Sequence, residues 1–432
     1  MALGGGTFID QNKILPGSYI NFVSLAKASA KLGERGVAAI ALELDWGIDG
    51  EVFEVTQEDF TESSLKVLGR TYDDEKLKGL RDLFKNIRTA YIYNLASGGE
   101  KAANDFATAR YPGERGNDLS IVIQADIDDP TKLDVYTLLG LRKVDHQTVT
   151  RAEELVANDF VEFKEGLTLE ETAKTPLTGG TKGVVDGQSH QDFLDKLEPY
   201  AINAVGCASE DEVIAGLYAA YTKRMRENVG KKFQCVVFNH KADYEGVVNV
   251  TTKAEEGDTD LIYWVTGAIA GCPVNRSNLN KIYDGEFTPI VDSTQGELEE
   301  SVKKGEFVLH RVNDDMRVLY DLNSLVTLSD EHGEIFQDNQ TVRVMDQIAN
   351  DIATIFNTKY LGTVVNDEAG RISLWSDIVM HHEKLEKIRA IQNFDAKNVK
   401  IYEGENKRAV VVHDLVNVTG TMAQLYMTVV ME

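Results

Sequence analysis

The stretch GVAAIALELDW, residues 36–46, decides the fold class of this chain. Its run of small and branched apolar residues predicts a buried β-strand. A second strand is predicted at residues 51–56, a helix with leucines at helical spacing at 75–88, and a further strand at 89–96. Because strands and a helix alternate along the chain, the sequence predicts an α/β layer.

The pattern of the sequence changes after Gly98. From about residue 98 to residue 169, short strand-like segments separated by turn residues dominate, with one or two helical turns among them. This pattern predicts a small β-sandwich or barrel inserted into the α/β body. Helices and strands alternate again after a glycine-rich segment at 175–187, so we expect a discontinuous α/β domain formed by residues 24–97 and 170–295.

The last third of the chain contains two strongly amphipathic helical segments. Their apolar stripes are formed by Val342, Met345, Ile348, Ile352 and Ile355 in the first segment, and by Ile372, Trp375, Ile378, Val379, Leu385 and Ile388 in the second. Strand-like segments precede and follow the two helices. We therefore predict a C-terminal α/β domain at residues 296–415, and a multidomain protein of mixed α/β class overall.

Both ends of the chain look like extended arms, at residues 1–23 and 416–432. The first arm contains strand-type residues at 7–22, and the chain ends on the apolar stretch LYMTVVME, residues 425–432. Proteins normally protect the edge of such a strand. Each arm therefore pairs either with the edge of its own domain or with the sheet of another molecule, and the residue pattern leaves both options open.

The composition argues against several classes of protein. The chain has 432 residues and a formal net charge of −25, whereas binding to nucleic acid needs clustered lysine and arginine. We expect no direct contact with nucleic acid, and we expect any assembly to depend on specific contacts. The N-terminus does not resemble a signal peptide, and the apolar runs are too short to span a bilayer. We therefore predict a protein made in the cytoplasm and not inserted in a membrane.

The three cysteines predict neither a disulfide framework nor a zinc site. Cys207, Cys235 and Cys272 form no CxxC pair and have apolar neighbours. An odd and sparse set of this kind is typical of buried, reduced and chemically silent thiols.

One glycine-rich loop is the best candidate for a catalytic or cofactor site. The segment from Leu177 to Val185 has the glycines of a phosphate-binding loop, but Lys182 is followed by Gly183, where such loops carry Ser or Thr. A flexible surface loop is the preferred interpretation. The alternative is a nucleotide-dependent α/β enzyme that uses the loop near Gly179.

The histidines do not form a recognisable metal or catalytic motif. His381 and His382 are adjacent, with Glu383 and Glu386 beside them, but the spacing is not that of a metal-binding helix. We predict a solvated helix face there. No nucleophile elbow or paired catalytic carboxylates stand out. We therefore predict no catalytic, cofactor-binding or metal-binding residues, no cofactor, and a protein that is not an enzyme.

A family resemblance enters at YPGERGND, from Tyr111 to Asp118, which closely resembles the YPG-x-x-GN turn of contractile tail sheath proteins. These proteins come from myophages and from phage tail-like particles of Gram-positive bacteria. Other segments resemble family segments in the same order: residues 11–22, 191–207, 274–285, 306–325, 346–379 and 425–432. Small departures are Ala208, where relatives often carry proline, and Arg276, where glutamine is more usual.

The resemblance implies a structural subunit of a homo-oligomer. Six-membered rings would stack helically around a tail tube, and the terminal arms would add strands to the C-terminal-domain sheet of neighbouring subunits. The residues expected to make these strands are Tyr19, Ile20, Asn21 and Phe22 in the N-terminal arm, and Leu425, Tyr426, Met427, Thr428, Val429 and Val430 in the C-terminal arm. Under this interpretation, the terminal strand pairs with another molecule.

The resemblance also implies a mechanical function and a set of partners. The sheath would contract from a metastable extended state and drive the tube through a target cell envelope. Its partners would be the tail tube, baseplate and tail terminator proteins, in a virion tail or a bacteriocin-like particle assembled in the host bacterial cytoplasm. The inserted β domain would face outward and the C-terminal domain would face the tube. We expect a possible tube contact through the polar side chains of Arg343, Asp346 and Asp351.

Overall fold

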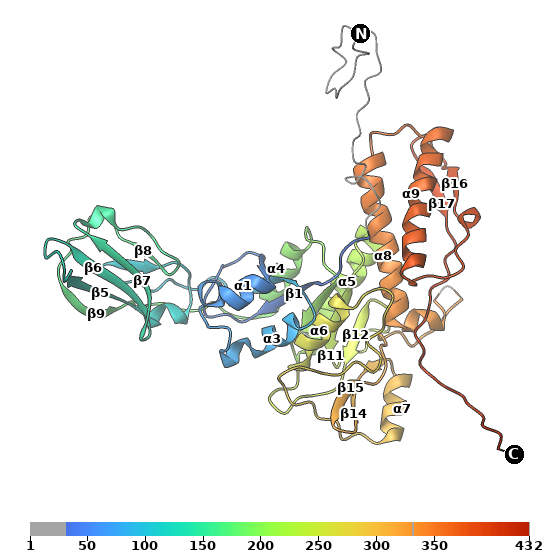
Figure 1. Ribbon diagram of the computed structural model, residues 1–432, viewed down its shortest axis with the longest axis horizontal. Helices are drawn as coiled ribbons and strands as arrows, with labels where there is room; N and C mark the ends of the chain where they lie inside the picture. The colour runs from blue at the N-terminus through green and yellow to red at the C-terminus, as the bar shows by residue number, and fades with distance from the viewer. Residues whose placement is uncertain (1–31, 331, 432) are drawn as a thin grey trace, which may run out of the picture. The chain divides into compact units, whose positions relative to one another are not determined.

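The structure is a computed structural model that describes residues 32–330 and 332–431 (Figure 1). The predicted N-terminal strand residues, Tyr19 to Phe22, lie outside the described residues. The chain divides into two compact units. The larger unit contains residues 34–349 and 418–432, and the smaller unit contains residues 1–33 and 350–417.

A seven-stranded sheet forms the centre of the larger unit. Its strand order is β13-β12-β11-β10-β1-β3-β2, and all neighbouring pairs are parallel except β2 with β3. The strands are β1 (Val37–Leu42), β2 (Phe53–Thr56), β3 (Thr89–Asn94), β10 (Ala204–Cys207), β11 (Gln234–Phe238), β12 (Val247–Val250) and β13 (Glu306–Phe307). The prediction of an α/β body is therefore confirmed.

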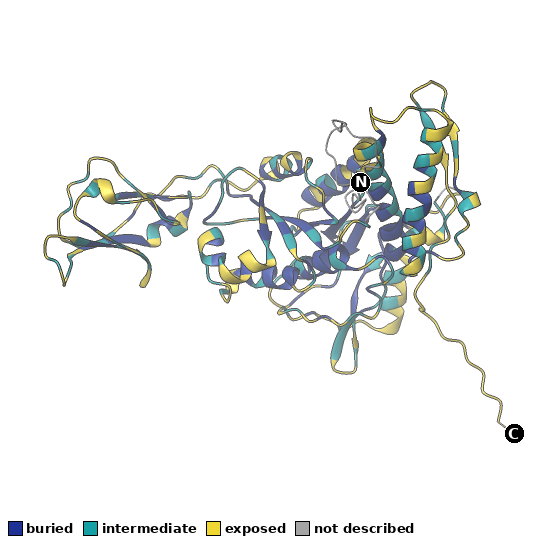
Figure 2. Cartoon of the chain, turned by 45° about the horizontal axis from the view of Figure 1, so that its top comes forward, coloured by how far each residue is buried: buried dark blue, intermediate teal, exposed yellow. Residues whose placement is uncertain are grey.

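Helices cover both faces of this sheet, as the alternation of side chains along β1 requires. Ala38 and Ile40 lie in one apolar cluster with α3 (Lys78–Phe84) and α6 (Leu261–Gly271). Ala39 and Ala41 lie in a second cluster with α4 (Gly187–Leu197) and α5 (Glu212–Arg224). Successive side chains of a strand point to opposite faces, so one apolar strand serves both cores. Figure 2 shows the central strands as buried.

Short elements complete the body around this sheet. They are α1 (Gln57–Glu62), α2 (Ser64–Leu68), α7 (Gln295–Lys303) and the antiparallel pair β14 (Leu309–Val312) and β15 (Asp315–Val318). The three cysteines are free and buried, as predicted. Burial raises the pKa of the Cys207 thiol to about 12, and it raises the pKa of Cys235 as well. The thiols are therefore poor nucleophiles.

The inserted region is a small β domain with its own core, as predicted. A four-stranded antiparallel sheet has the order β7-β6-β5-β9, and β4 pairs with β8. The strands are β4 (Ala107–Ala109), β5 (Leu119–Ala125), β6 (Leu133–Leu139), β7 (Arg142–Val149), β8 (Val161–Phe163) and β9 (Thr172–Pro176). Ile121, Val135 and Val161 are almost completely buried in a shared apolar cluster.

The glycine-rich segment forms one side of a neck that leads into this β domain. Glu100 and Thr181 exchange two backbone hydrogen bonds of 3.1 Å, and the N–H of Gly183 donates to the carbonyl oxygen of Ala96 at 2.8 Å. A Cβ atom on Gly183 would lie 1.8 Å from the carbonyl oxygen of Ser97. The glycines thus allow two backbones to run side by side, and Lys182 is paired with Glu43. The segment is a surface loop, as predicted, and hydrogen bonds hold it against residues 96–100.

The turn from Tyr111 to Asp118 fastens the β domain to the body. Gly113 has a φ of +125°, and a Cβ atom there would lie 2.1 Å from the carbonyl oxygen of Asp45. The side-chain amide of Asn117 donates to the carbonyl oxygen of Gly180 and accepts from its N–H, both at 2.8 Å. The Trp46 ring, which is 1% exposed, meets Tyr111 edge-on. The residues of this turn therefore act as an interdomain joint.

The described part of the smaller unit contains two helices and a hairpin. α8 (Asn339–Ile355) begins in the larger unit and ends in the smaller one, where a π-helical turn (Phe356–Tyr360) continues it. α9 (Glu368–Lys387) and the antiparallel strands β16 (Lys400–Glu403) and β17 (Val410–His413) follow. The apolar core includes Ile352, Tyr360, Leu374, Ile378 and Val399. Within the described residues, no helix is long and apolar enough to span a membrane.

We predict that Asn117→Ala weakens the joint between the β domain and the body. The substitution leaves the N–H and the carbonyl oxygen of Gly180 without their partner, which costs about 2 kcal/mol of unfolding free energy. Urea unfolding followed by tryptophan fluorescence tests this, because Trp46 lies at the joint. Asn117→Asp keeps the acceptor for the Gly180 N–H but sets a carboxylate oxygen against the Gly180 carbonyl oxygen, so it should also be less stable than the unmodified chain. Unchanged stability in Asn117→Ala would contradict the assignment.

Candidate functional site

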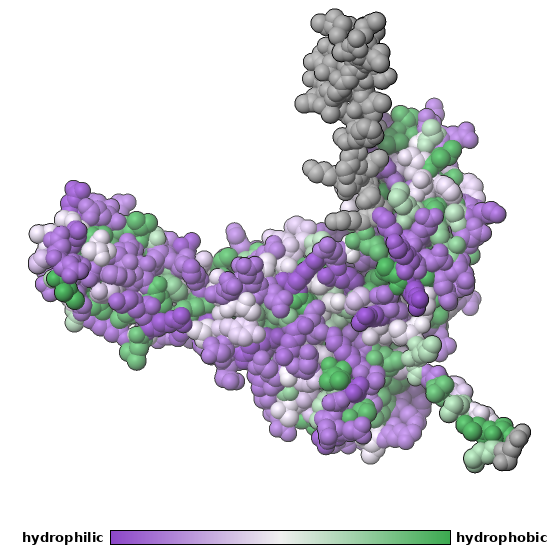
Figure 3. Space-filling model, in the orientation of Figure 1, coloured by the Kyte–Doolittle hydropathy of each residue, from purple (hydrophilic) through white to green (hydrophobic). Residues whose placement is uncertain are grey.

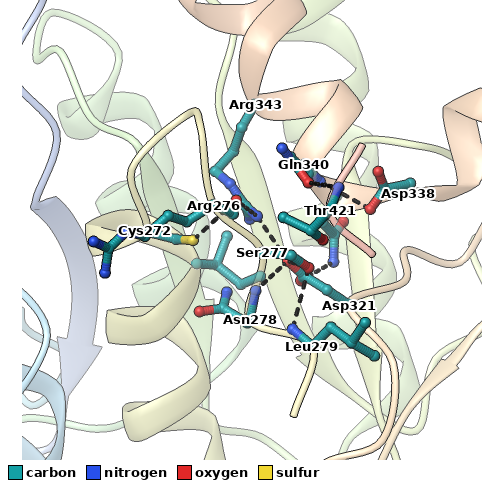
Figure 4. Close-up of polar contacts among 12 residues, drawn as sticks. Cys272, Arg276, Ser277, Asn278, Leu279, Asp321, Asp338, Gln340, Arg343 and Thr421 are labelled. Carbon is teal, nitrogen blue, oxygen red and sulfur yellow. Dashed lines mark hydrogen bonds and ion pairs between the residues drawn. The ribbon is translucent and has the colours of Figure 1, made fainter. Parts of the chain in front are cut away.

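The candidate site lies where the C-terminal segment, residues 418–431, returns to the larger unit. Gln340, in the first turn of α8, donates from Nε2 to the carbonyl oxygen of Thr419 at 2.8 Å. Its Oε1 accepts the backbone N–H of Thr421 at 3.1 Å (Figure 4). The glutamine amide thus both donates to and accepts from the backbone of the segment, as the backbone of a neighbouring strand would. It anchors residues 419–421 to the body.

Beyond this anchor the C-terminal segment is exposed and apolar. Residues 422–431 belong to no helix or strand. The exposed fractions are 100% for Met422, 84% for Leu425, 88% for Tyr426, 73% for Met427, 69% for Val429, 84% for Val430 and 90% for Met431. Figure 3 shows the hydrophobic side chains gathered along this segment. The predicted strand at 425–430 therefore joins no sheet in the described part of the chain.

The beginning of α8 is held in place by buried polar groups. Asn339 is completely buried, and its side chain donates to Asp321 at 3.0 Å and to the carbonyl oxygen of Leu322 at 2.7 Å. The backbone N–H of Gln340 donates to Asp338 at 3.1 Å, which caps the helix. These bonds fix the position from which Gln340 reaches the C-terminal segment.

A buried ion pair lies one turn further along α8. Arg343 Nη2 donates to Asp321 Oδ2 at 2.7 Å, and both side chains are 1% exposed. Burial alone would raise the pKa of Asp321, but the Arg343 charge and the hydrogen bonds to the carboxylate outweigh it and hold that pKa below its usual value. Asn278 contributes one of these bonds through its backbone N–H, at 2.8 Å. Asp321 is therefore an ionised carboxylate at neutral pH.

The three side chains proposed for tube contact are all buried. Arg343 is 1% exposed, Asp346 is 5% and Asp351 is 7%. Asp346 Oδ2 accepts from Arg226 Nη1 at 2.6 Å, and Asp351 Oδ2 lies 2.9 Å from His381 Nε2. The prediction that these residues form an exposed polar face is therefore wrong. Their polarity serves pairs inside the chain, and the partners are too far away in sequence to be recognised.

The histidine pair is also buried, so the prediction of a solvated helix face is wrong. His381 and His382 are both 0% exposed. His382 Nε2 lies 2.6 Å from Asp414 Oδ2, and the two Nδ1 atoms lie 3.1 Å apart. Residues 32–330 and 332–431 contain no cluster of histidine, cysteine and acidic side chains suited to a metal ion. No local sequence signal could have identified this group, because Asp351 and Asp414 are some 30 residues away.

The hairpin of β16 and β17 is the sheet found in the described part of the smaller unit. Within the described residues, each of these strands pairs only with the other. Tyr402 is 49% exposed, Val411 is 41% and Val412 is 38%. A hollow of about 560 Å³ is lined in part by residues 361–366 and by Val410 at the start of β17. A two-stranded sheet is marginally stable alone, and its free edges can accept further strands.

Comparisons with known proteins cover most of the chain. Family models match in succession: the phage tail sheath protein beta-sandwich domain at residues 97–183, the phage tail sheath protein central domain at 183–324, and the phage tail sheath C-terminal domain at 331–432. These three ranges include the β domain, most of the sheet of the larger unit, and the α8, α9 and β16–β17 elements.

Solved and curated relatives agree with the family models. A sheath tail protein of Desulfitobacterium hafniense is similar at 32% identity and a TM-score of 0.80, over 93% of this chain and 96% of that one. A sheath tail protein of Listeria innocua has 30% identity and a TM-score of 0.79, over 91% and 94%. The phage-like element PBSX protein XkdK of Bacillus subtilis is 31% identical over 90% of this chain and 88% of its own length.

We predict that Gln340→Ala releases the anchored C-terminal segment. Without the glutamine acceptor, the backbone N–H of Thr421 should exchange with solvent about tenfold faster, because its part-buried hydrogen bond is lost. Hydrogen exchange of peptides that contain residues 418–423 measures this. Gln424→Ala is the control, since that exposed glutamine holds no backbone group of the segment, and exchange there should match the unmodified chain. Slow exchange at Thr421 in Gln340→Ala would contradict the anchor.

Proposed function

Because the chain belongs to the phage tail sheath protein family, we propose that it is the subunit of a contractile sheath in which six-membered rings stack around a tail tube. The chain is a structural component of a phage tail or tail-like particle, and its family is not one of enzymes. The proposal concerns how the subunits connect and what the assembly does.

The observation that carries the proposal is the exposed apolar segment behind a fixed anchor. Met422 to Met431 expose large apolar side chains to water, while Gln340 holds the backbone at Thr419 and Thr421. Leaving such a surface in water is unfavourable, and covering it recovers about 25 cal/mol for each Å² of apolar area. A segment that is fixed at its root and apolar beyond it suits a tether that is covered by a neighbouring subunit.

The β16–β17 hairpin is the acceptor that we propose for these tethers. In the described part of the chain, strands Lys400–Glu403 and Val410–His413 pair only with each other, and they expose apolar side chains. Residues 425–430 of one subunit would add a strand to this hairpin in another subunit, and Tyr19 to Phe22 would add a further strand from a third. Backbone hydrogen bonds then provide the affinity, and alternate side chains provide the specificity. A sheet of three or more strands also gains the stability that a hairpin lacks.

Such tethers allow the assembly to change shape without falling apart. Each body would rotate and slide while its arms stay in their neighbours' sheets, so an extended lattice would convert to a contracted one of lower free energy. Contraction would drive the tube through a target cell envelope. The β domain would face outward and the C-terminal domain, residues 296–415, would face the tube. Baseplate and terminator proteins would contact the sheath ends, and assembly would take place in the host bacterial cytoplasm.

We predict that deleting residues 424–432 gives a folded subunit that does not polymerise. The deleted segment contributes nothing to a sheet or an apolar core of the described chain, so the unfolding free energy should stay unchanged. Electron microscopy of the full-length and truncated proteins at equal concentration, each with tube protein added, is the measurement. Sheath tubes or rings that form with the full-length protein and not with the truncated protein support the proposal. A truncated protein that unfolds, or that assembles normally, contradicts it.

We predict that single prolines in the arm block assembly according to their position. Successive N–H groups of an extended strand point to opposite sides, and proline removes one of them. If the arm is the outer strand, one of Thr428→Pro and Val429→Pro should prevent assembly and the other should not. If the arm lies between two strands, both should prevent it. The alanine variants at the same positions are the controls and should assemble. Normal assembly of both proline variants would refute strand pairing here.

A further inference from the structure

A row of hydrogen-bonded side chains connects the two ends of the smaller unit. Asp351 Oδ2 lies 2.9 Å from His381 Nε2, the two histidine Nδ1 atoms lie 3.1 Å apart, and His382 Nε2 lies 2.6 Å from Asp414 Oδ2. The carboxylate of Asp351 also accepts the backbone N–H of Gly33, at 3.1 and 3.2 Å. The row therefore begins at Gly33, where the chain passes from this unit to the larger one, and ends at Asp414, shortly before the chain passes to the larger unit again at residue 418.

The geometry of this row fixes the number of its hydrogen atoms. Each contact needs one hydrogen between its two heavy atoms. Both Nε2 atoms face carboxylates, which accept, so each Nε2 carries a hydrogen. The contact between the two Nδ1 atoms needs a third hydrogen. A neutral imidazole carries only one N–H, so three hydrogens on two rings make one ring an imidazolium and leave the other neutral. Imidazole is a stronger base than carboxylate, so the third hydrogen belongs to a ring.

We infer that Asp351, His381, His382 and Asp414 form a clamp that shares one extra proton and couples the roots of the two arms. The four groups carry a net charge of −1 in this state. A further proton places hydrogens on both Nδ1 atoms, and the loss of one leaves two lone pairs facing each other. Either change breaks the central contact and separates the Gly33 side of the clamp from the Asp414 side. That the two terminal segments act as tethering arms rests on the proposed function; the proton count does not.

The surroundings of the two rings support a shared proton. His381 and His382 are both 0% exposed, so water does not compete for their nitrogen atoms. The carboxylates paired with the two rings are Asp351 from α8 and Asp414 after β17. The segment after α9 contributes the aromatic ring of Phe394, 5.2 Å from His382. Two carboxylates on either side of a buried pair of imidazoles stabilise one positive charge between them.

Nuclear magnetic resonance of the unassembled full-length chain with ¹⁵N-labelled histidine tests the proton count. At pH 7.5, His381 and His382 should together show three protonated ring nitrogens, and the exposed His413 provides the reference for an ordinary ring. The signals are assigned from the spectra of His381→Gln and His382→Gln. Two neutral rings with one hydrogen each, both on Nε2, would overturn the inference. This measurement needs no assembly, so it is independent of the sheath proposal.

Hydrogen exchange tests the coupling between the two ends. Asp414→Ala removes one carboxylate, so the extra proton and the central contact should be lost, and an uncharged His381 should then hold Asp351 less tightly. Exchange at the backbone N–H of Gly33, which Asp414 does not touch, should then rise about tenfold. His413→Ala, at the neighbouring exposed residue, should leave it unchanged. A rise confined to residues 410–417 would overturn the coupling, and failure to polymerise would bear only on the proposed function.

Discussion

The ion pair between Arg343 and Asp321 is the interaction on which the rest of the arrangement depends. A charge left alone at a site that is 1% exposed costs several kcal/mol, so the two residues have to meet, and their meeting fixes the rotation of α8 about its own axis. Asn339 adds a bond to the same carboxylate. With the rotation fixed, Gln340 faces the C-terminal segment. The same helix carries Asp351, which accepts the N–H of Gly33, so one helix positions the groups that hold Gly33 and Thr419.

Local patterns in the sequence were sufficient for the architecture of the body. The apolar run at residues 37–42 predicts a strand buried on both faces, and the structure places its alternate side chains in two separate cores. The inserted β domain was likewise predictable from short strands and turns. The role of the neck glycines was not predictable. They are needed because two segments about 80 residues apart in sequence approach each other closely. A glycine pattern alone does not distinguish a free loop from a crossing of two backbones.

The candidate site was predictable in part, and the errors have one physical origin. The apolar end of the chain, LYMTVVME, indicates an arm directly, since nothing in the segment itself could cover it. The polar residues of α8 and α9 were misinterpreted because an amphipathic pattern separates polar from apolar positions and does not tell solvated groups from buried pairs. Arg343, Asp346 and His381 find partners 22, 120 and 30 residues away, respectively. Helical spacing does not identify such distant partners. It also does not show that the amide of Gln340 binds the backbone of Thr419 and Thr421.

The reciprocal bonds between Glu100 and Thr181 mean that the chain enters and leaves the β domain through adjacent points. The β domain therefore connects two adjacent points of the larger unit, as a tight turn between them would. Provided that the Tyr111–Asp118 joint is kept, the region beyond it behaves as an exchangeable cassette. Its length and sequence can diversify, or carry a foreign peptide, while the folding of the sheet and the attachment of the arms remain the same.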